Sequence, residues 1–344
     1  MTRRARVVVA AAATAVLLGG AAVYAVLAIA EFQARRAPAV VTSSVSGADG
    51  ARGTGTTVYF RNTDIADGYG YVASVPVDDP GAARAFTDVQ CDRVYAATTA
   101  DDGTRSICLR IDRGILTAFS ANLVDDAGET TKTWPLPGLP SRARMSADGE
   151  LVAFTAFVTG ESYGSIDFST ATQVATTGGT EFGNLETFTL LIDGAVNAAA
   201  DRNFWGVTFT DDDNVFYDTA ATGGNTWLVR GDLAARTLTS VRETAECPSV
   251  SPDGGRIAYK KNLSTGAEAH WSIAVLDLAT GKETLMPDDR SIDDQIEWLD
   301  DDTLLYAMPG AAAGDSDVWS IPADGTGAST LFLPHASSPT VVRR

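Results

Sequence analysis

The sequence has few of the residues that hold metals or carry out redox chemistry. It contains three cysteines and two histidines, and no two cysteines are spaced as C-x-x-C. Because structural zinc sites draw on clustered Cys and His ligands, no zinc site is expected. No phosphate-binding loop, dinucleotide fingerprint or basic-aromatic cluster occurs. The sequence therefore predicts no cofactor and no nucleic-acid partner.

Basic residues are also scarce. The chain has 26 Lys and Arg against 44 Asp and Glu, which gives a formal net charge of −18. Residues 1–36 contain five Arg and one Glu, a net charge of +4, so the remainder carries −22. A body this acidic repels nucleic acid and anionic lipid and favours neutral or basic partners.

A long uncharged run lies near the N-terminus. Residues 7–30 form 24 consecutive uncharged positions after three Arg. At about 1.5 Å per residue, a helix of this length crosses a hydrocarbon core of about 30 Å. The preceding Arg residues favour a cytoplasmic N-terminus and a body on the outer side. We therefore expect residues 1–30 to be a signal-anchor of a single-pass membrane protein. Cleavage after Ala30, in the pattern Ala28-Ile29-Ala30, is the alternative and predicts a secreted protein.

The residues that follow change in composition. Residues 31–56 are rich in Ala, Gly, Ser and Thr and have no hydrophobic period, which predicts a flexible linker. Residues 57–344 show no sustained helical period, so we expect this domain to be all-β.

A turn signature recurs through this domain. Turns built from Ser, Asp, Pro and Gly precede short β-type runs because Pro fixes φ, Asp caps the turn and Gly tolerates positive φ. The two clearest copies are Ser146, Ala147, Asp148 and Gly149, and Ser251, Pro252, Asp253 and Gly254. Acidic copies lie at 211–214 and 300–303. In these turns we interpret the acidic residues as turn caps rather than Ca²⁺ ligands, since none matches an EF-hand loop.

Counting these repeats predicts a propeller. Strands that follow a turn start at six positions: Val58, Arg93, Leu151, Val215, Arg256 and Leu304. Six units with Trp spacings typical of four-stranded blades predict a six-bladed β-propeller. The C-terminal segment 338–342 has no blade of its own, so we expect it to complete the first blade and close the ring.

The repeats also resemble a known family. The segments SVSPDGGRIAYKK, VLDLATGKETLM and VWSIPADGTG are similar to the repeat of TolB-like six-bladed propellers, over most of residues 57–342. NFWGVTFTDDDN, ECPSVSPDG and IEWLDDDTLLYA, together with the N-terminal run, resemble actinobacterial membrane-anchored members. The resemblance implies a propeller outside the cytoplasm and, as for TolB, binding of partner proteins in the cell envelope.

Three sets of side chains are candidates for specific roles. Cys91 and Cys108 are expected to face each other across two antiparallel strands and form a disulfide, whereas Cys247 is interpreted as a buried apolar residue. Trp205 and Trp298 fall near blade ends and are candidates for a binding surface. The other three tryptophans of the repeat are expected to pack between blades: Trp227, Trp271 and Trp319.

The sequence favours a binding protein over an enzyme. Residues 160–164 match G-x-S-x-G, but the following residues are poor helix formers, so a nucleophile elbow is not expected. We expect a monomeric, non-enzymatic envelope module that presents its loops or channel to a protein, peptide or glycan. One alternative is a hydrolase or lyase that acts on a cell-wall polymer through channel carboxylates. A tethered sensory module is another.

Overall fold

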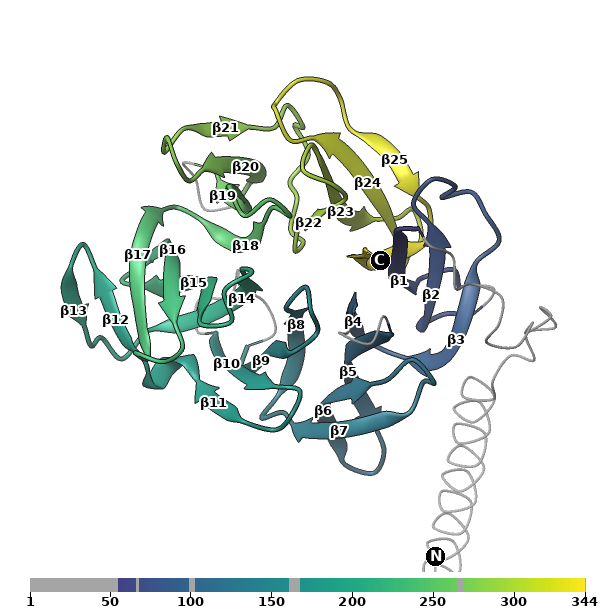
Figure 1. Cartoon of the computed structure of the whole chain (residues 1–344), viewed down its shortest axis with the longest axis horizontal. Coiled ribbons are helices and arrows are strands. Elements are labelled where there is room, and N and C mark those ends of the chain that lie inside the picture. The colour runs from purple at the N-terminus through teal and green to yellow at the C-terminus, as the bar shows by residue number, and fades with distance from the viewer. Residues whose placement is uncertain (1–54, 66–67, 99–102, 161–167, 265–268, 344) are drawn as a thin grey trace, which may run out of the picture. The chain divides into compact units, whose positions relative to one another are not determined.

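The computed structural model describes residues 55–65, 68–98, 103–160, 168–264 and 269–343. Within them the chain forms six sheets, antiparallel except for one strand pair, around a central axis (Figure 1). This arrangement confirms the all-β, six-bladed propeller. The one helical element of the described part is a 3-10 turn at Leu185–Thr187. No described helix has the length and apolar character to cross a membrane. The run 7–30 lies outside the described residues.

The strands of each blade follow one another from the axis outward. Blade 1 contains β26 (Ala336–Val342), β1 (Thr57–Asn62), β2 (Tyr71–Pro76) and β3 (Ala85–Gln90). Blade 2 contains β4 (Arg93–Thr98), β5 (Thr104–Arg113), β6 (Thr117–Val124) and β7 (Thr130–Pro135). Blade 3 contains β8 (Leu139–Met145), β9 (Leu151–Thr159), β10 (Ser169–Thr176) and β11 (Glu181–Asn184).

Blade 4 is larger than the others. It contains β14 (Asn203–Phe209), β15 (Val215–Thr222), β16 (Asn225–Asp232) and β17 (Thr237–Glu243), and then β12 (Thr189–Ile192) and β13 (Ala195–Asn197). The pairing of β12 with β17 is parallel. Blade 5 contains β18 (Glu246–Val250), β19 (Arg256–Asn262), β20 (Trp271–Asp277) and β21 (Glu283–Leu285). Blade 6 contains β22 (Glu297–Trp298), β23 (Thr303–Pro309), β24 (Ser316–Pro322) and β25 (Thr330–Leu333).

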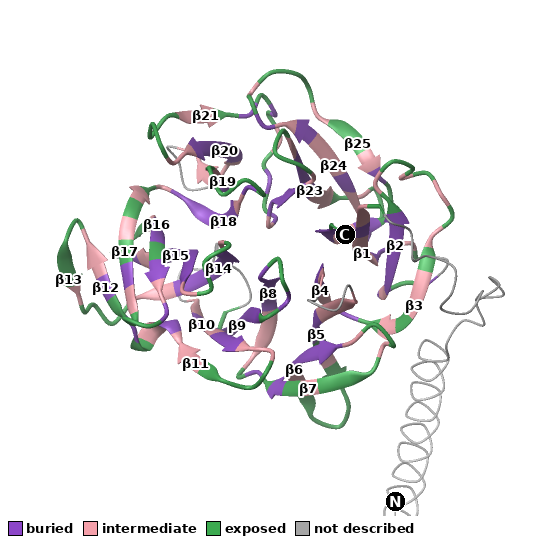
Figure 2. Ribbon diagram, in the orientation of Figure 1, coloured by how far each residue is buried: buried purple, intermediate pink, exposed green. Residues whose placement is uncertain are grey.

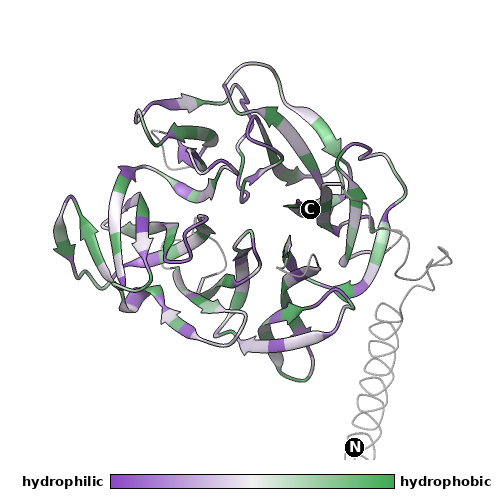
Figure 3. Ribbon diagram, viewed as in Figure 1, coloured by the Kyte–Doolittle hydropathy of each residue, from purple (hydrophilic) through white to green (hydrophobic). Residues whose placement is uncertain are grey.

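The hydrophobic core is divided among the six interfaces between neighbouring blades. Burial differs among the second strands: β9 is buried over its first seven residues, whereas β1 alternates buried and partly buried positions. Burial follows the inner strands in Figure 2, and hydrophilic residues gather in the connections in Figure 3. The smallest of the six cores lies between blades 1 and 2 and includes Cys91 and Cys108.

The ring closes through its C-terminal strand. β26 pairs with β1 in antiparallel register, with Thr57 opposite Val342 and Tyr59 opposite Thr340. The predicted closing role of 338–342 is therefore confirmed. Closure leaves blade 1 with a complete inner strand instead of an exposed edge.

The predicted strand starts fall into two groups. Five of them lie in or next to second strands: Val58, Leu151, Val215, Arg256 and Leu304. Arg93 instead begins β4, the inner strand of blade 2. The reason is that two residues alone, Cys91 and Asp92, link β3 to β4. The turn signature expected before a second strand falls at 99–103, which is mostly outside the described residues.

The two faces of the ring carry different connections. Turns that join first to second strands, such as 146–150 and 251–255, lie on one face, which we call the turn face. Hairpins that join second to third strands, such as the one between β5 and β6, lie on the opposite face, which we call the hairpin face. Since Thr57 is opposite Val342 at the end of the closing strand, the first described strand starts on the turn face.

Candidate functional site

The inner strands surround a cavity that opens toward the turn face. It has a volume of about 250 Å³ and is lined from all six blades. We call it the wide cavity. Hydroxyl groups of Thr98, Thr210 and Ser249 line it together with the apolar side chains of Phe209 and Val250. A wall of this mixed character suits a short segment of chain that offers hydrogen-bonding groups and apolar side chains.

The predicted turns shape its rim. The Ser251 hydroxyl oxygen accepts from the Arg256 backbone N–H at 2.9 Å, and the Ser146 hydroxyl accepts from Leu151 N–H at 2.8 Å. The glycines in these turns have positive φ, 70° at Gly254 and 73° at Gly149, as the sequence required. All the predicted turn residues occupy such turns: Ser146, Asp148, Gly149, Ser251, Pro252, Asp253 and Gly254. Three of them line the wide cavity: Ser251, Pro252 and Gly254.

A charged cluster forms the floor of the wide cavity. Arg144 Nη1 lies 2.5 Å from Glu297 Oε2, and both side chains are almost fully buried. The Tyr95 hydroxyl donates to Glu297 at 3.2 Å, and the Arg144 guanidinium lies 4.7 Å from the Tyr95 ring centroid. Glu297 also accepts from the Val341 backbone N–H at 3.2 Å. We call Tyr95, Arg144 and Glu297 the central cluster. It joins blades 2, 3 and 6 to the closing strand.

The surroundings fix the protonation states of Arg144 and Tyr95. Burial alone would lower the pKa of Arg144, but the neighbouring Tyr95 and Glu297 outweigh it and raise that pKa. Burial, reinforced by the Glu297 charge, raises the pKa of Tyr95. Both shifts move titration further above neutral pH, so Arg144 stays charged and Tyr95 stays neutral. Neither group is suited to proton exchange at physiological pH.

A second, narrow cavity lies on the other side of the central cluster. Its volume is about 20 Å³, room for about one water molecule. Tyr95, Arg144 and Glu297 line both cavities, so they separate one from the other. Charged residues at its edge are paired across blades, as in the 3.4 Å contact between Arg93 Nη1 and Asp294 Oδ1.

The carboxylates around the wide cavity do not form the pair that the hydrolase or lyase alternative requires. The described acidic residues that line it are Glu297 and Asp211. Glu297 is bound to Arg144, Tyr95 and the closing strand, whereas Asp211 is exposed on a turn. An acid and a base that act together need two carboxyls held in different environments around one reacting bond. The geometry therefore favours binding over catalysis.

The two tryptophans predicted to lie on a surface are buried. Trp205 is 1% exposed and Trp298 is 2% exposed, because both lie in inner strands, β14 and β22. The Trp298 indole N–H donates to Ser249 O at 2.9 Å, which links blade 6 to blade 5. Neither side chain therefore lies on the outer surface, although Trp298 lines the wide cavity. The remaining three lie in third strands and are partly buried, as expected for blade packing: Trp227, Trp271 and Trp319.

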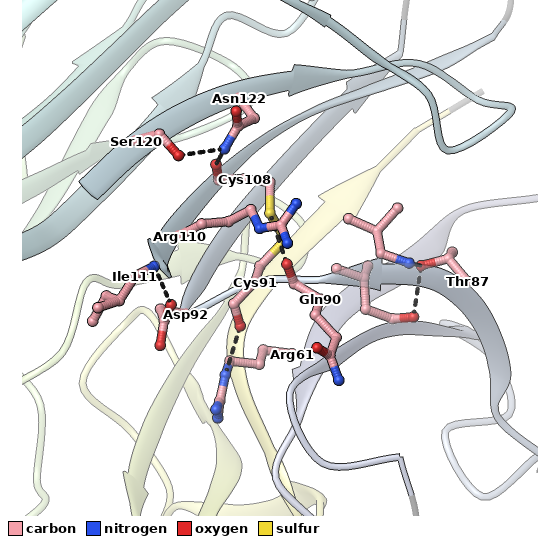
Figure 4. Close-up of a disulfide and its surroundings, with 12 residues drawn as sticks. Arg61, Thr87, Gln90, Cys91, Asp92, Cys108, Arg110, Ile111, Ser120 and Asn122 are labelled. Carbon is pink, nitrogen blue, oxygen red and sulfur yellow. Dashed lines mark hydrogen bonds between the residues drawn. A yellow bond between two sulfur atoms is a disulfide. The ribbon is translucent and has the colours of Figure 1, made fainter. Parts of the chain in front are cut away.

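The predicted disulfide is present. Cys91 and Cys108 are bonded with a Cα–Cα distance of 5.4 Å (Figure 4). Its setting differs from the prediction, since Val94 and not Cys91 lies opposite Cys108 in the pairing of β4 with β5. Cys91 belongs to the link between blades, so the bond ties that link to β5. Cys247 is buried and free, as predicted.

One cluster was not predicted. Ligand atoms of Asp315, Asp317 and His335 lie within 4.8 Å of one another. Each is already used: His335 Nδ1 lies 2.8 Å from Asp315, which also accepts from Thr63, and His335 N–H donates to Asp317 at 2.9 Å. These bonds fasten blade 6 to the chain on either side of the closure. The residues are far apart in sequence, so no local spacing signals them.

The remaining sequence candidates have structural roles or lie outside the described part. In the acidic turns, Asp212 accepts from Asn214 N–H and Asp300 accepts from Asp302 N–H, both at 2.9 Å, as expected of turn caps. Of the G-x-S-x-G match at 160–164, residues 161–164 lie outside the described residues.

The fold is a six-bladed β-propeller that is similar in structure to TolB. No protein-family model and no curated protein matches the sequence, whereas solved structures do. TolB from Acinetobacter baumannii is 18% identical with a TM-score of 0.56, covering 83% of this chain and 66% of that one. A chain of a nidogen–laminin complex is 12% identical with a TM-score of 0.51. The match covers 83% of this chain and 98% of that one. The present chain thus spans about two thirds of that TolB, and identities this low establish the fold alone.

Proposed function

We propose that this protein is a non-enzymatic binding module of the cell envelope that takes a short segment of a partner protein into the wide cavity. Residues 7–30 hold it in the membrane, with the propeller on the outer side. The observation that carries the proposal is the wide cavity itself. It is open at the turn face, lined from every blade and closed below by the central cluster.

The size and chemistry of the cavity support a peptide segment. A volume of about 250 Å³ accommodates a few side chains and excludes a folded domain. Of the residues that line it, Ser249 offers a polar group to a peptide backbone, and Phe209 and Val250 can receive apolar side chains. Binding of an extended segment by a rigid ring avoids the cost of ordering the receptor.

The likeness to other propellers is consistent with a protein partner. One similar chain comes from a nidogen–laminin complex, in which two proteins associate, and another is TolB. The disulfide supports the compartment, because such bonds persist mainly where the surroundings are oxidising. The 24 uncharged residues after three Arg support the anchor.

Cross-linking in intact cells tests the binding proposal. Ala147 is exposed in a turn and lines the wide cavity, so Ala147→Trp should block the cavity without disturbing the core. Ala235 is also exposed but lies in the outer hairpin of blade 4, so Ala235→Trp is a matched control. We expect a specific cross-linked protein with the wild type and Ala235→Trp, and its loss with Ala147→Trp.

Other outcomes separate the parts of the proposal. A partner retained by Ala147→Trp would place the binding site elsewhere on the ring. Capture of a glycan, or turnover of a wall fragment by the purified protein, would contradict a protein-binding role. Release of a soluble form that starts near Glu31 would refute the anchor and leave the cavity proposal intact.

A further inference from the structure

Exposed apolar side chains collect on the hairpin face. Six of the exposed large hydrophobic residues lie at or beside hairpins between second and third strands, in blades 1, 2, 3 and 5: Ile65, Tyr69, Ile115, Leu116, Val158 and Leu263. The other exposed ones lie on β13 or on outer strands: Val196, Val241, Leu285 and Leu331. Among the described residues, the hairpin face therefore exposes more large apolar side chains than the turn face, as interaction surfaces do.

The hairpin of blade 2 extends beyond the strands that flank it. The pairing of β4 with β5 ends at Leu109, and that of β7 with β6 ends at Ser120. Three further pairs, from Ile111–Phe119 to Arg113–Thr117, belong to β5 and β6 alone (labelled in Figure 2). We call residues 111–119 the finger. Its tip consists of Ile115 and Leu116, which are 106% and 85% exposed.

A free two-stranded ribbon with an apolar tip is poorly suited to water. Two strands alone are marginally stable, and two adjacent aliphatic side chains at full exposure lose the benefit of burial. Arg110 and Arg113 lie behind the tip, with Arg110 Nη2 3.9 Å from Asp112. We call Arg110 and Arg113 the basic collar. An aliphatic tip followed by basic residues matches a lipid interface, where the aliphatic side chains enter the acyl region and the guanidinium groups reach the phosphates.

The finger also keeps the acidic ring away from lipid phosphates. The Ile111–Phe119 pair is still held to the blade, because Ile111 N–H donates to Asp92 and Phe119 O accepts from Leu136 N–H. Beyond it, residues 112–114 carry the tip about 10 Å outward at roughly 3.4 Å per residue. This is more than the screening length of about 8 Å at physiological ionic strength. The basic collar therefore meets the headgroups while the repulsion from the body, at −22, is largely screened.

We propose that the finger inserts Ile115 and Leu116 into the outer surface of the membrane and so docks the hairpin face on lipid. This inference rests on the anchoring in the proposed function. The wide cavity, on the opposite face, would then point away from the membrane toward a partner.

Affinity and reach favour a tethered bilayer over a free protein partner. Burial of two aliphatic side chains gives an affinity on the order of millimolar, which is too weak to hold a dissolved partner. The area that two side chains bury is also far below that of a specific protein interface. A tether supplies effective concentrations of that same order. Residues 31–56 extend up to about 86 Å at roughly 3.3 Å each. The chain enters the ring on the turn face, and this length exceeds the height of a seven-residue inner strand, about 23 Å.

A fluorescent probe at the tip tests the contact. The full chain is reconstituted into phosphatidylcholine vesicles with Ile115→Cys labelled by an environment-sensitive dye. The disulfide and the burial of Cys247 leave the new thiol as the reactive one among the described residues. Ala235→Cys, exposed on the turn face, is the matched control. With nitroxide-labelled acyl chains in the vesicles, we expect loss of emission at position 115 and none at 235.

A second variant separates insertion from mere proximity. In the Ile115→Cys protein, Leu116→Asp should abolish the loss of emission while the circular dichroism spectrum stays unchanged, because residue 116 contacts no core. Unquenched emission at 115 from vesicle-bound protein would overturn the finger proposal and leave the anchor standing. Protein that fails to stay with the vesicles would overturn the anchor itself. Protection of the probe by an added envelope protein, without lipid quenching, would show a protein-docking finger and overturn lipid insertion.

Discussion

Two of the buried carboxyl side chains in this ring, Glu297 and Asp218, have very different surroundings. Glu297, in the inner strand of blade 6, is 4% exposed and bound by Arg144, Tyr95 and the closing strand. Asp218, in the second strand of blade 4, is 0% exposed, and neither carboxyl oxygen has a hydrogen-bond partner among the described residues. The first acid is bound by partners from several blades, whereas the second makes no hydrogen bond within the described part of the chain.

The difference shows how the ring handles buried charge. A charge at the axis is surrounded by inner strands from several blades, so partners from distant parts of the sequence can converge on it. Asp218 lies in a second strand, where neither carboxyl oxygen finds a hydrogen-bond partner among the described residues, so its ionised form is unfavourable. Burial therefore raises the pKa of Asp218 well above its ordinary value, although the nearby Thr219 backbone N–H opposes the shift.

Removal of one partner in the central cluster should have the largest effect on stability. Glu297→Ala leaves the Arg144 guanidinium buried without its counter-charge and also removes the acceptor for Tyr95 and Val341. We expect a loss of about 3–5 kcal/mol in the free energy of unfolding, measured by urea denaturation.

Two further variants sharpen that result. Glu243→Ala changes an exposed glutamate in β17 and should shift stability by less than about 0.5 kcal/mol. The double variant Arg144→Met, Glu297→Met removes both charges and should recover most of the loss. Equal effects of Glu297→Ala and Glu243→Ala would show that the cluster does not hold the blades together.

The disulfide offers a covalent counterpart to the charged cluster and should have the next largest effect. It joins positions 17 residues apart and reinforces the smallest interblade core. In the loop-entropy model, replacing Cys91 and Cys108 with Ser should cost about 3 kcal/mol. A reductant should lower the unfolding midpoint of the wild type and leave the variant unchanged. Equal alkylation of all three cysteines under native conditions without reductant would contradict the bond.

The local parts of this fold were predictable from sequence because each is specified by a few adjacent residues. The Ser251 to Gly254 turn, for example, carries its own hydrogen bonds and its own positive φ. Residues 338–342 were recognisable as a closing strand because they follow a turn and have no blade of their own. The Cys91–Cys108 pairing was predictable from spacing, although its place in the link between blades was not.

The parts that depend on convergence were not predictable. Tyr95 and Glu297 are 202 positions apart, and Arg144 and Glu297 are 153 apart, so no spacing signals their contact. The burial of Trp205 and Trp298 was not predicted for a related reason, since position along a blade does not show which neighbouring blade covers a side chain. The extra strands of blade 4 were missed because β12 pairs in parallel with β17, and four strands separate the two in the chain.

The smallest effect, and the sharpest contrast with Glu297, concerns pH. The folded-state pKa of Asp218 is raised above the ordinary value of about 3.9. At a pH between these two values, Asp218 is deprotonated in the unfolded chain and protonated in the folded chain. The unfolded state then binds fewer protons, and stability must fall as pH rises through this window, by at most about 1.4 kcal/mol per pH unit. Asp218→Asn cannot ionise, so its stability relative to the wild type should increase from pH 5 to pH 8. Parallel stability profiles for the two proteins over this range would show that Asp218 is compensated after all.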